Sequence, residues 1–111
     1  MVLKPEQFTE QAQEVIGESQ AIVRRYRHSQ WDSEHVLLAL LEHREGVPAE
    51  ILKRLDVSVD AMHDRLNQLL QQAPNIAEES AQIYVPPRAA SMLDRAKSEA
   101  DRLNDEFIGT E

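Results

Sequence analysis

The most apolar stretch of the chain is the uninterrupted run from Val36 to Leu41, in which every residue except Val36 is Leu or Ala. This composition favours a helix over a strand. Before the run, Asp32 and Ser33 can accept hydrogen bonds from the free N–H groups of a helix start, and Glu34 suits its positive first turn. A helix that is apolar on every side is a buried one. We therefore predict that this helix is the centre of the fold.

Apolar residues at spacings of three and four predict further helices on both sides of the central one. Thr9 is a good N-cap for the first of them. Pro48 suits the first turn of a short helix, Ser58 caps the next, and Pro86 with Pro87 opens the last. Basic residues gather at the end of the first helix, where the helix dipole favours them, namely Arg24, Arg25, Arg27 and His28.

A polar stretch over residues 71–85, which contains Pro74, divides the chain into unequal parts. We predict a first helical unit over residues 1–70, a linker over 71–85, and the start of a second unit over 86–111. The second unit repeats the first without a gap when Ala89 is aligned with Ala12, an offset of 89 minus 12, or 77 residues. Positions of like kind are then matched, including Phe8/Val85, Val15/Met92, Ile16/Leu93, Val23/Ala100, Tyr26/Leu103 and Trp31/Ile108.

In this register Glu111 is the counterpart of Glu34, so the sequence stops before a counterpart of the central helix. We expect the second repeat to be incomplete for this reason. The apolar positions of the last helix should then lack part of their cover, and these are Met92, Leu93, Ala96 and Ala100.

The charge and the composition exclude several classes of function. A net charge of −8 argues against nucleic acid and anionic membranes as partners, because their phosphates would be repelled. The chain has no cysteine, so it has no disulfide framework and no thiolate chemistry. No signal peptide begins the sequence, which fits a cytoplasmic protein. The histidines lack zinc-ligand spacing, so we expect no metal, and we expect His35 to bond locally at its helix start.

Two groups of motifs resemble the Clp N-terminal domain and together extend over nearly the whole chain. The first repeat carries FTEQA at 8–12, SEHVLLALL at 33–41, GVP at 46–48 and IL at 51–52. The second carries YVPPRA at 84–89 and FIGTE at 107–111. The resemblance implies an all-α module of two pseudo-symmetric repeats, with four helices each in the full domain, at the front of hexameric AAA+ unfoldases such as ClpB and ClpC. The end of the linker, QIYV at 82–85, favours the ClpB branch.

The resemblance also implies where the domain holds its partners, at Thr9, Glu34, Asp105 and Glu111. Carboxylates there could accept hydrogen bonds from a guanidinium group or a substrate N–H, and Thr9 with its helix N-terminus could donate to an anion. The ClpC branch uses such paired sites for phosphoarginine, and the ClpB branch uses this region for unfolded segments. Pro86 replaces the hydroxyl residue that would match Thr9, so the second phosphate-type site is incomplete. Thr9, Glu34 and Glu111 could equally act only as helix caps.

The sequence therefore predicts a substrate- and adaptor-binding module of a Clp-type AAA+ chaperone, with unfolded or aggregated protein segments as its partners. It lacks a Gly-rich phosphate loop, so we expect no enzyme activity and no cofactor here, with ATP bound elsewhere in a homohexameric parent. One alternative is a stand-alone Clp-repeat subunit that docks on a protease complex. Another is an enzyme with an acidic active site, which would need a deep pocket lined by two carboxylates.

Overall fold

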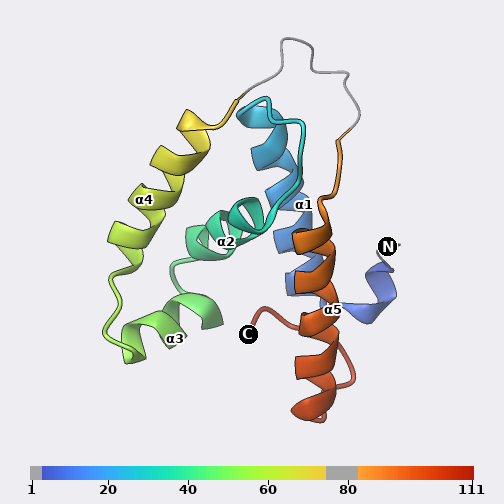
Figure 1. Cartoon of the computed structure of the whole chain (residues 1–111). Helices are drawn as coiled ribbons and strands as arrows, with labels where there is room; N and C mark the ends of the chain where they lie inside the picture. Colours follow the sequence, from blue (N-terminus) through green and yellow to red (C-terminus); the bar gives the residue numbers. More distant parts are fainter. Residues whose placement is uncertain (1–3, 75–82) are drawn as a thin grey trace.

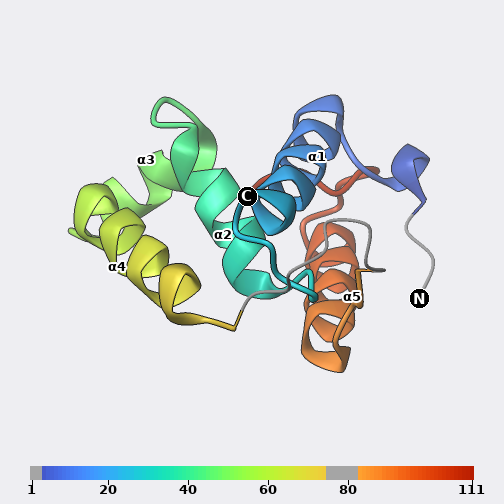
Figure 2. The same ribbon diagram turned by 90° about the horizontal axis from the view of Figure 1, so that it is seen from above.

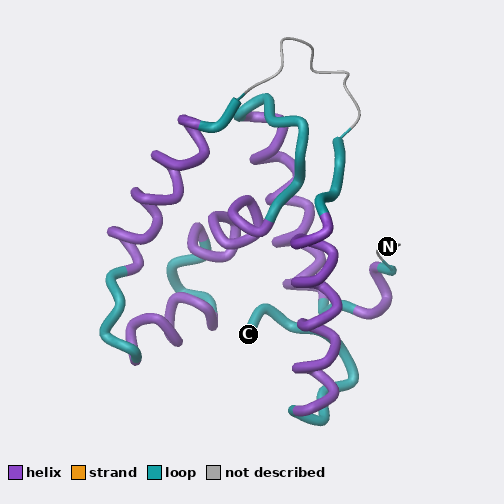
Figure 3. Tube along the Cα trace, in the orientation of Figure 1, coloured by secondary structure: helices purple, strands orange, loops and turns teal. Residues whose placement is uncertain are grey.

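The computed structural model describes residues 4–74 and 83–111 (Figure 1). Within them the chain is helical, and no β-strand is present in this part of the chain (Figure 3). This confirms the predicted all-α class. The elements are η1 (Pro5–Gln7), a short 3₁₀ helix, followed by α1 (Glu10–Arg25), α2 (Ser33–Glu42), α3 (Val47–Arg54), α4 (Val59–Gln72) and α5 (Pro87–Arg102).

Helix α2 is the centre of the fold, as its apolar pattern predicts. It contacts each of the other four α-helices, and Figure 2 shows it between the α3–α4 pair and the α1–α5 pair. Leu38, Ala39 and Leu41 are completely buried. At its start, Ser33 donates its backbone N–H to the Asp32 carboxylate at 2.7 Å, and Asp32 donates its own N–H to the His35 ring at 3.0 Å. These local bonds satisfy the free groups of the first turn and confirm the roles expected for Asp32 and His35.

The side chains of α2 take part in two hydrophobic cores. The first core joins α2 to α1, α3 and α4, and its buried members are Val15, Ile22, Leu38, Ala39, Leu41, Ala49, Val59, Leu66 and Leu70. The second core joins α1 to α5 and to the segments beside them, and its buried members are Phe8, Ala12, Val23, Trp31, Leu93, Ala100 and Ile108. Helix α5 is therefore held by the second core, and α2 contacts it as well.

The internal repeat is visible in the backbone. Helices α1 and α5 begin at residues 10 and 87 and end at residues 25 and 102, so both boundaries differ by the 77 residues of the sequence register. After each helix a residue in the same register takes the left-handed conformation, Arg27 with φ 56° and Asn104 with φ 60°. Because the boundaries of both helices share one register, the structure confirms two pseudo-symmetric repeats.

The two repeats also pair with each other reciprocally. Ile108 donates its N–H to the Gln7 carbonyl at 2.8 Å, and the equivalent bond runs from Trp31 to the Tyr84 carbonyl at 2.9 Å. Thr9 adds a bond from its N–H to the Ile108 carbonyl at 2.9 Å. Its counterpart Pro86 has no N–H, so that bond cannot form in the other half. The pairing ties the lead-in of each repeat to the loop of the other.

The boundaries of the units agree with the prediction only in part. Helix α4 continues through Gln72, so residues 71 and 72 belong to a helix and not to the expected linker. Residues 75–82 of that linker lie outside the described residues, and the division into 1–70, 71–85 and 86–111 stays a prediction. Among the described residues, no helix is long and apolar enough to cross a membrane.

Candidate functional site

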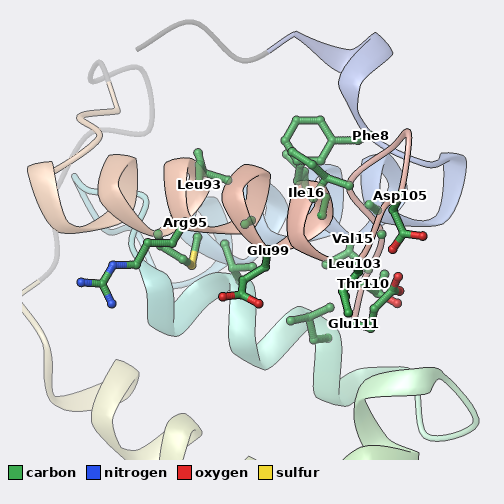
Figure 4. A pocket seen from close by; sticks show the side chains of 18 of the residues that line it. Phe8, Val15, Ile16, Leu93, Arg95, Glu99, Leu103, Asp105, Thr110 and Glu111 are labelled. Carbon is green, nitrogen blue, oxygen red and sulfur yellow. The ribbon is translucent and has the colours of Figure 1, made fainter.

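A groove with a volume of about 450 Å³ runs along α5, between that helix, α1, α2 and the C-terminal segment 103–111 (Figure 4). We call it the α5 groove. Most of its lining is apolar, and these residues are Phe8, Ala12, Val15, Ile16, Val36, Leu40, Met92, Leu93, Ala96, Ala100, Leu103 and Ile108. A concave apolar surface with a few polar groups at its edge is typical of a binding site.

The groove tests the expectation that the apolar face of α5 is only partly covered. Met92 and Ala96 line the groove and are half-buried, as expected. Leu93 and Ala100 also line it, but they are 5% and 7% exposed, so the prediction was wrong for them. Both belong to the second core, where side chains of α1 and the C-terminal segment cover them.

The charged side chains of the groove are divided between its two ends. Figure 4 shows Asp105 and Glu111 at one end, Arg95 at the other, and Glu99 between them. Glu99 is already paired with Arg102, three residues further along α5, at 2.7 Å. The groove is therefore acidic where the C-terminal segment closes it and basic at the opposite end.

The position of the Glu111 side chain depends on a glycine. A Cβ atom placed on Gly109 would lie 2.5 Å from Glu111 Oε2, which is closer than such atoms approach in proteins. The carboxylate thus lies directly over the Gly109 backbone. In the first repeat the counterpart of Gly109 is Asp32, whose side chain caps α2.

Thr9 lies next to the groove without lining it. Its hydroxyl oxygen accepts a hydrogen bond from the Ala12 N–H at 3.1 Å, which is the N-cap role expected from the sequence. Its backbone N–H donates a hydrogen bond to the Ile108 carbonyl. The contribution of Thr9 that the structure displays is therefore to start α1 and to anchor the segment that carries Glu111.

Glu34, the fourth predicted site residue, faces a different environment. Its carboxylate accepts hydrogen bonds from Arg88 at 2.9 and 3.0 Å, and the same guanidinium group binds Asp32 at 2.6 and 2.9 Å. Burial raises the pKa of Asp32, but the bonds from Arg88 and from the Ser33 N–H outweigh it and leave the pKa lowered. The structure thus brings Asp105 and Glu111 together and separates them from Glu34.

Arg88 is a residue that the sequence reading missed. It lies at the start of α5, while both of its partners lie at the start of α2. No local pattern marks such a long-range contact. The structure explains the contact, because reciprocal pairing of the two lead-in segments brings the start of each repeat's first helix close to the loop of the other.

Beside Glu34, a buried chain of hydrogen bonds runs through two histidines. The His35 ring contacts the His28 ring at 2.8 Å between Nε2 and Nδ1, and His28 Nε2 lies 2.9 Å from the Leu70 carbonyl. Because the Asp32 N–H donates to His35 Nδ1, one assignment of ring protons satisfies every contact: His35 donates to His28, and His28 donates to Leu70. Burial, assisted by the neighbouring His28, lowers the pKa of His35 to about 4. We call this chain the histidine relay.

The relay and the Arg88 cluster line a second pocket, with a volume of about 470 Å³, together with the end of α4. Its polar groups are largely committed to one another, since Asp32 and Glu34 bind Arg88 and the two histidines bind each other. In the α5 groove, by contrast, the carboxylates of Asp105 and Glu111 lie beside a large apolar surface. We therefore take the α5 groove as the candidate binding site.

Comparison with known proteins agrees with the helical repeat. A sequence model of the family described as "Clp repeat (R) N-terminal domain" matches residues 7–111. Among curated relatives, the chaperone protein ClpB 2 of Nostoc sp. is 34% identical over 107 residues, which is 96% of this chain and 12% of the relative. The chain therefore spans about an eighth of the length of that relative.

Solved structures show the same fold. The N-terminal domain of the ClpV1 ATPase from enteroaggregative E. coli superposes with a TM-score of 0.81 at 22% identity, over 94% of this chain and 63% of that one. A second structure, whose description reads "Peptide from EAEC T6SS Sci1 SciI protein", gives a TM-score of 0.83 at 22% identity, over 94% of this chain and 65% of that one. At this level of identity the likeness establishes the fold.

Proposed function

The chain belongs to the family of Clp repeat N-terminal domains, and on that premise we propose that it is the substrate- and adaptor-binding module of a Clp-type AAA+ chaperone. The module holds an exposed segment of an unfolded or aggregated protein, or of an adaptor, for ATP-driven rings elsewhere in the parent. The setting we propose is a cytoplasmic homohexamer, with ATP bound outside this domain and no cofactor within it.

The observation that carries this proposal is the apolar α5 groove with Asp105 and Glu111 at one end. Leu or Phe side chains of a client would gain free energy by leaving water for the groove. The two carboxylates would accept hydrogen bonds from an arginine or from free backbone N–H groups of the same client. Thr9 supports the site by holding the C-terminal segment in place.

The charges of the groove favour unmodified clients over phosphoarginine. A phosphate would be repelled by Asp105 and Glu111, and Pro86 supplies neither the hydroxyl nor the N–H that Thr9 has in the first repeat. Arg88 already binds Glu34, so a client would compete with Arg88 for this carboxylate. The preferred segment is therefore apolar with a basic residue beside it.

A titration with a labelled peptide tests the proposal. The probe is a 15-residue peptide of Leu, Phe and Ser with two prolines, which prevent a helix, and one terminal Arg. Its fluorescence anisotropy should rise on addition of the protein. Met92→Asp should weaken binding, because it places a charge in the apolar groove. The double variant Asp105→Asn, Glu111→Gln should weaken it roughly fivefold and should lose the preference for Arg over Ser at the probe's end.

Two matched variants outside the groove serve as controls. Asp64→Asn on α4 removes one exposed carboxylate, and Leu55→Ser removes an apolar side chain that is 66% exposed after α3. Both should bind the probe like the parent chain. A probe that does not bind, or that responds equally to the groove variants and to the controls, would show that the α5 groove does not hold clients.

A further inference from the structure

We propose that the histidine relay is a proton-sensitive latch on the junction between the two repeats. The closed relay holds the loop of the first repeat that pairs with the start of the second. Uptake of one proton breaks the relay, releases this loop and loosens the start of α5. The latch lies within the fold, and it acts whatever partner the α5 groove binds.

The relay fixes both ends of a short loop between α1 and α2, residues 28–32, which we call the junction loop. His28 begins this loop, and its Nε2 atom lies 2.9 Å from the Leu70 carbonyl in the last turn of α4. Asp32 ends the loop, and its N–H donates to the His35 ring at 3.0 Å. Because the two rings contact each other at 2.8 Å, buried side chains connect the two ends of the junction loop.

The junction loop carries contacts between the first repeat and the start of the second. Tyr84 donates its N–H to the Ser29 carbonyl at 2.8 Å, and its own carbonyl accepts the Trp31 N–H at 2.9 Å. Arg88, in the first turn of α5, binds the Asp32 carboxylate at 2.6 Å. The relay therefore supports the loop to which the start of α5 is anchored.

The closed relay has no ring nitrogen available for another proton. His35 accepts the Asp32 N–H at Nδ1 and donates from Nε2 to His28, which in turn donates to the Leu70 carbonyl. A proton added to His35 Nδ1 would face the N–H of Asp32, and one added to His28 Nδ1 would face the N–H of His35. Uptake of one proton therefore breaks a bond at the end of the loop or the bond between the rings.

The surroundings of the rings favour proton uptake in the open state. The charged and titratable groups around the relay are Tyr26, with Arg25 over its ring, and Arg27 from the end of α1, Asp32 and Glu34 from the start of α2, and Arg88 from α5, whereas α4 contributes the Leu70 carbonyl. Burial and the neighbouring His28 outweigh the attraction of Asp32 and lower the pKa of His35 from 6.5 to about 4. A ring released from the relay regains the higher value, so acid favours the open junction. The second pocket borders both rings and connects them with solvent.

The internal repeat shows that the junction itself does not require a histidine. The counterpart of His28 is Asp105, an offset of 105 minus 28, or 77 residues. The equivalent backbone bond nevertheless forms in both halves, from Trp31 to Tyr84 and from Ile108 to Gln7. The histidine therefore adds a response to pH to a pairing that forms with a different residue at the same position.

Amide hydrogen exchange of the whole chain, followed by NMR at pH 7.5 and pH 5, tests the latch. After correction for the intrinsic effect of pH on exchange, the protection factors of the Trp31 and Tyr84 amides should fall about 30-fold at pH 5. This is the factor that a His35 pKa of 6.5 in the open junction and about 4 in the closed one gives. Both amides should stay less protected than that of Leu41 in α2 at either pH.

Two histidine variants separate the relay from other effects of acid. His35→Gln keeps an acceptor for the Asp32 N–H but removes the ring, so it should abolish the fall in protection at the junction. His63→Gln removes a histidine of α4 that lies outside the relay and should retain the 30-fold fall.

The parent chain alone can overturn the proposal, even if His35→Gln does not fold. A loss of protection at Leu41 without one at Trp31 and Tyr84 would show that the relay breaks only in global unfolding. Equal protection of all three amides at pH 5 would show that the junction does not open by itself. An undiminished fall in a folded His35→Gln variant would assign the response to other groups.

Discussion

Acidification from pH 7.5 to pH 5 should destabilise the domain through the histidine relay. The His35 ring accepts the Asp32 N–H at Nδ1 and uses its other nitrogen on His28, so a second ring proton would face a donor and not an acceptor. His35 is only 3% exposed, so water cannot readily replace the hydrogen bond from the Asp32 N–H that protonation would break. Protonation of His35 is therefore incompatible with the relay.

The magnitude follows from the pKa values of the two states. In the unfolded chain the pKa of His35 is 6.5, and burial lowers it to about 4 in the folded chain. Because the unfolded state takes up the proton first, the contribution of His35 is fully present above pH 6.5 and is lost as the pH falls toward 4. The whole difference is about 3 kcal/mol, of which about 2 kcal/mol should be lost by pH 5. For a chain of this size that corresponds to a melting temperature lower by about 8 °C.

Urea denaturation and thermal melts followed by circular dichroism at the two pH values measure this loss. His35→Gln removes the titrating ring, so it should lower stability at pH 7.5 and show a smaller further loss at pH 5. His63→Gln removes a histidine that lies outside the relay and should retain the full pH dependence. The pKa of Asp32 is lowered as well, so its contribution to stability is lost only at a lower pH, where the carboxylate becomes protonated. A free energy of unfolding that is equal at pH 7.5 and 5, or an equal loss in His35→Gln, would refute the reasoning.

Three further predictions concern the central helix and the two carboxylate clusters. Leu38→Ala should cost about 2–5 kcal/mol of unfolding free energy in a denaturant titration, and Leu38→Asp should abolish the cooperative melt, because this side chain is completely buried. Arg88→Met should lower the melting temperature at low salt and lose much of that difference at 1 M NaCl, because it removes the ion pairs to Asp32 and Glu34; a difference independent of salt would count against an electrostatic role. Gly109→Ala should leave the melting temperature nearly unchanged, since the flexible Glu111 side chain can move away, yet it should weaken the Arg-containing probe; unchanged affinity would mean that the carboxylate position does not matter.

The sequence predicted those parts of the fold that local physics controls. The apolar run of α2, the caps at Thr9, Asp32 and Ser58, and the proline-led start of α5 all depend on residues within a turn of one another. The repeat register was also readable, because both copies keep the same order of apolar and polar positions. The predicted end of a helix was wrong where helix-compatible residues continue past it, as at Gln72 in α4.

The site was predicted less completely, because its contacts join distant parts of the chain. His28 was interpreted as a basic residue favoured by the dipole of α1, whereas it is buried and contacts Leu70 at the end of α4. Glu34 and Glu111 are equivalent in the register. Arg88 forms an ion pair with Glu34, however, whereas Glu111 lines the groove. The counterpart of Arg88 in the first repeat is Gln11, which carries no charge, and only the assembled fold shows what this difference does.

The reciprocal backbone pairing of the two repeats has a consequence for the order of folding. Its bonds join residue 7 to residue 108 and residue 31 to residue 84, so they close long loops and carry a large entropy cost of closure. The first core needs only residues 15–70 and can form before them. We therefore expect α5 and the segment with Glu111 to dock last and to open first. In hydrogen exchange, the amides of Thr9, Trp31, Tyr84 and Ile108 should open together, well before those of α2. The α5 side of the binding groove and the C-terminal segment should therefore form the least stable cooperative unit of the domain.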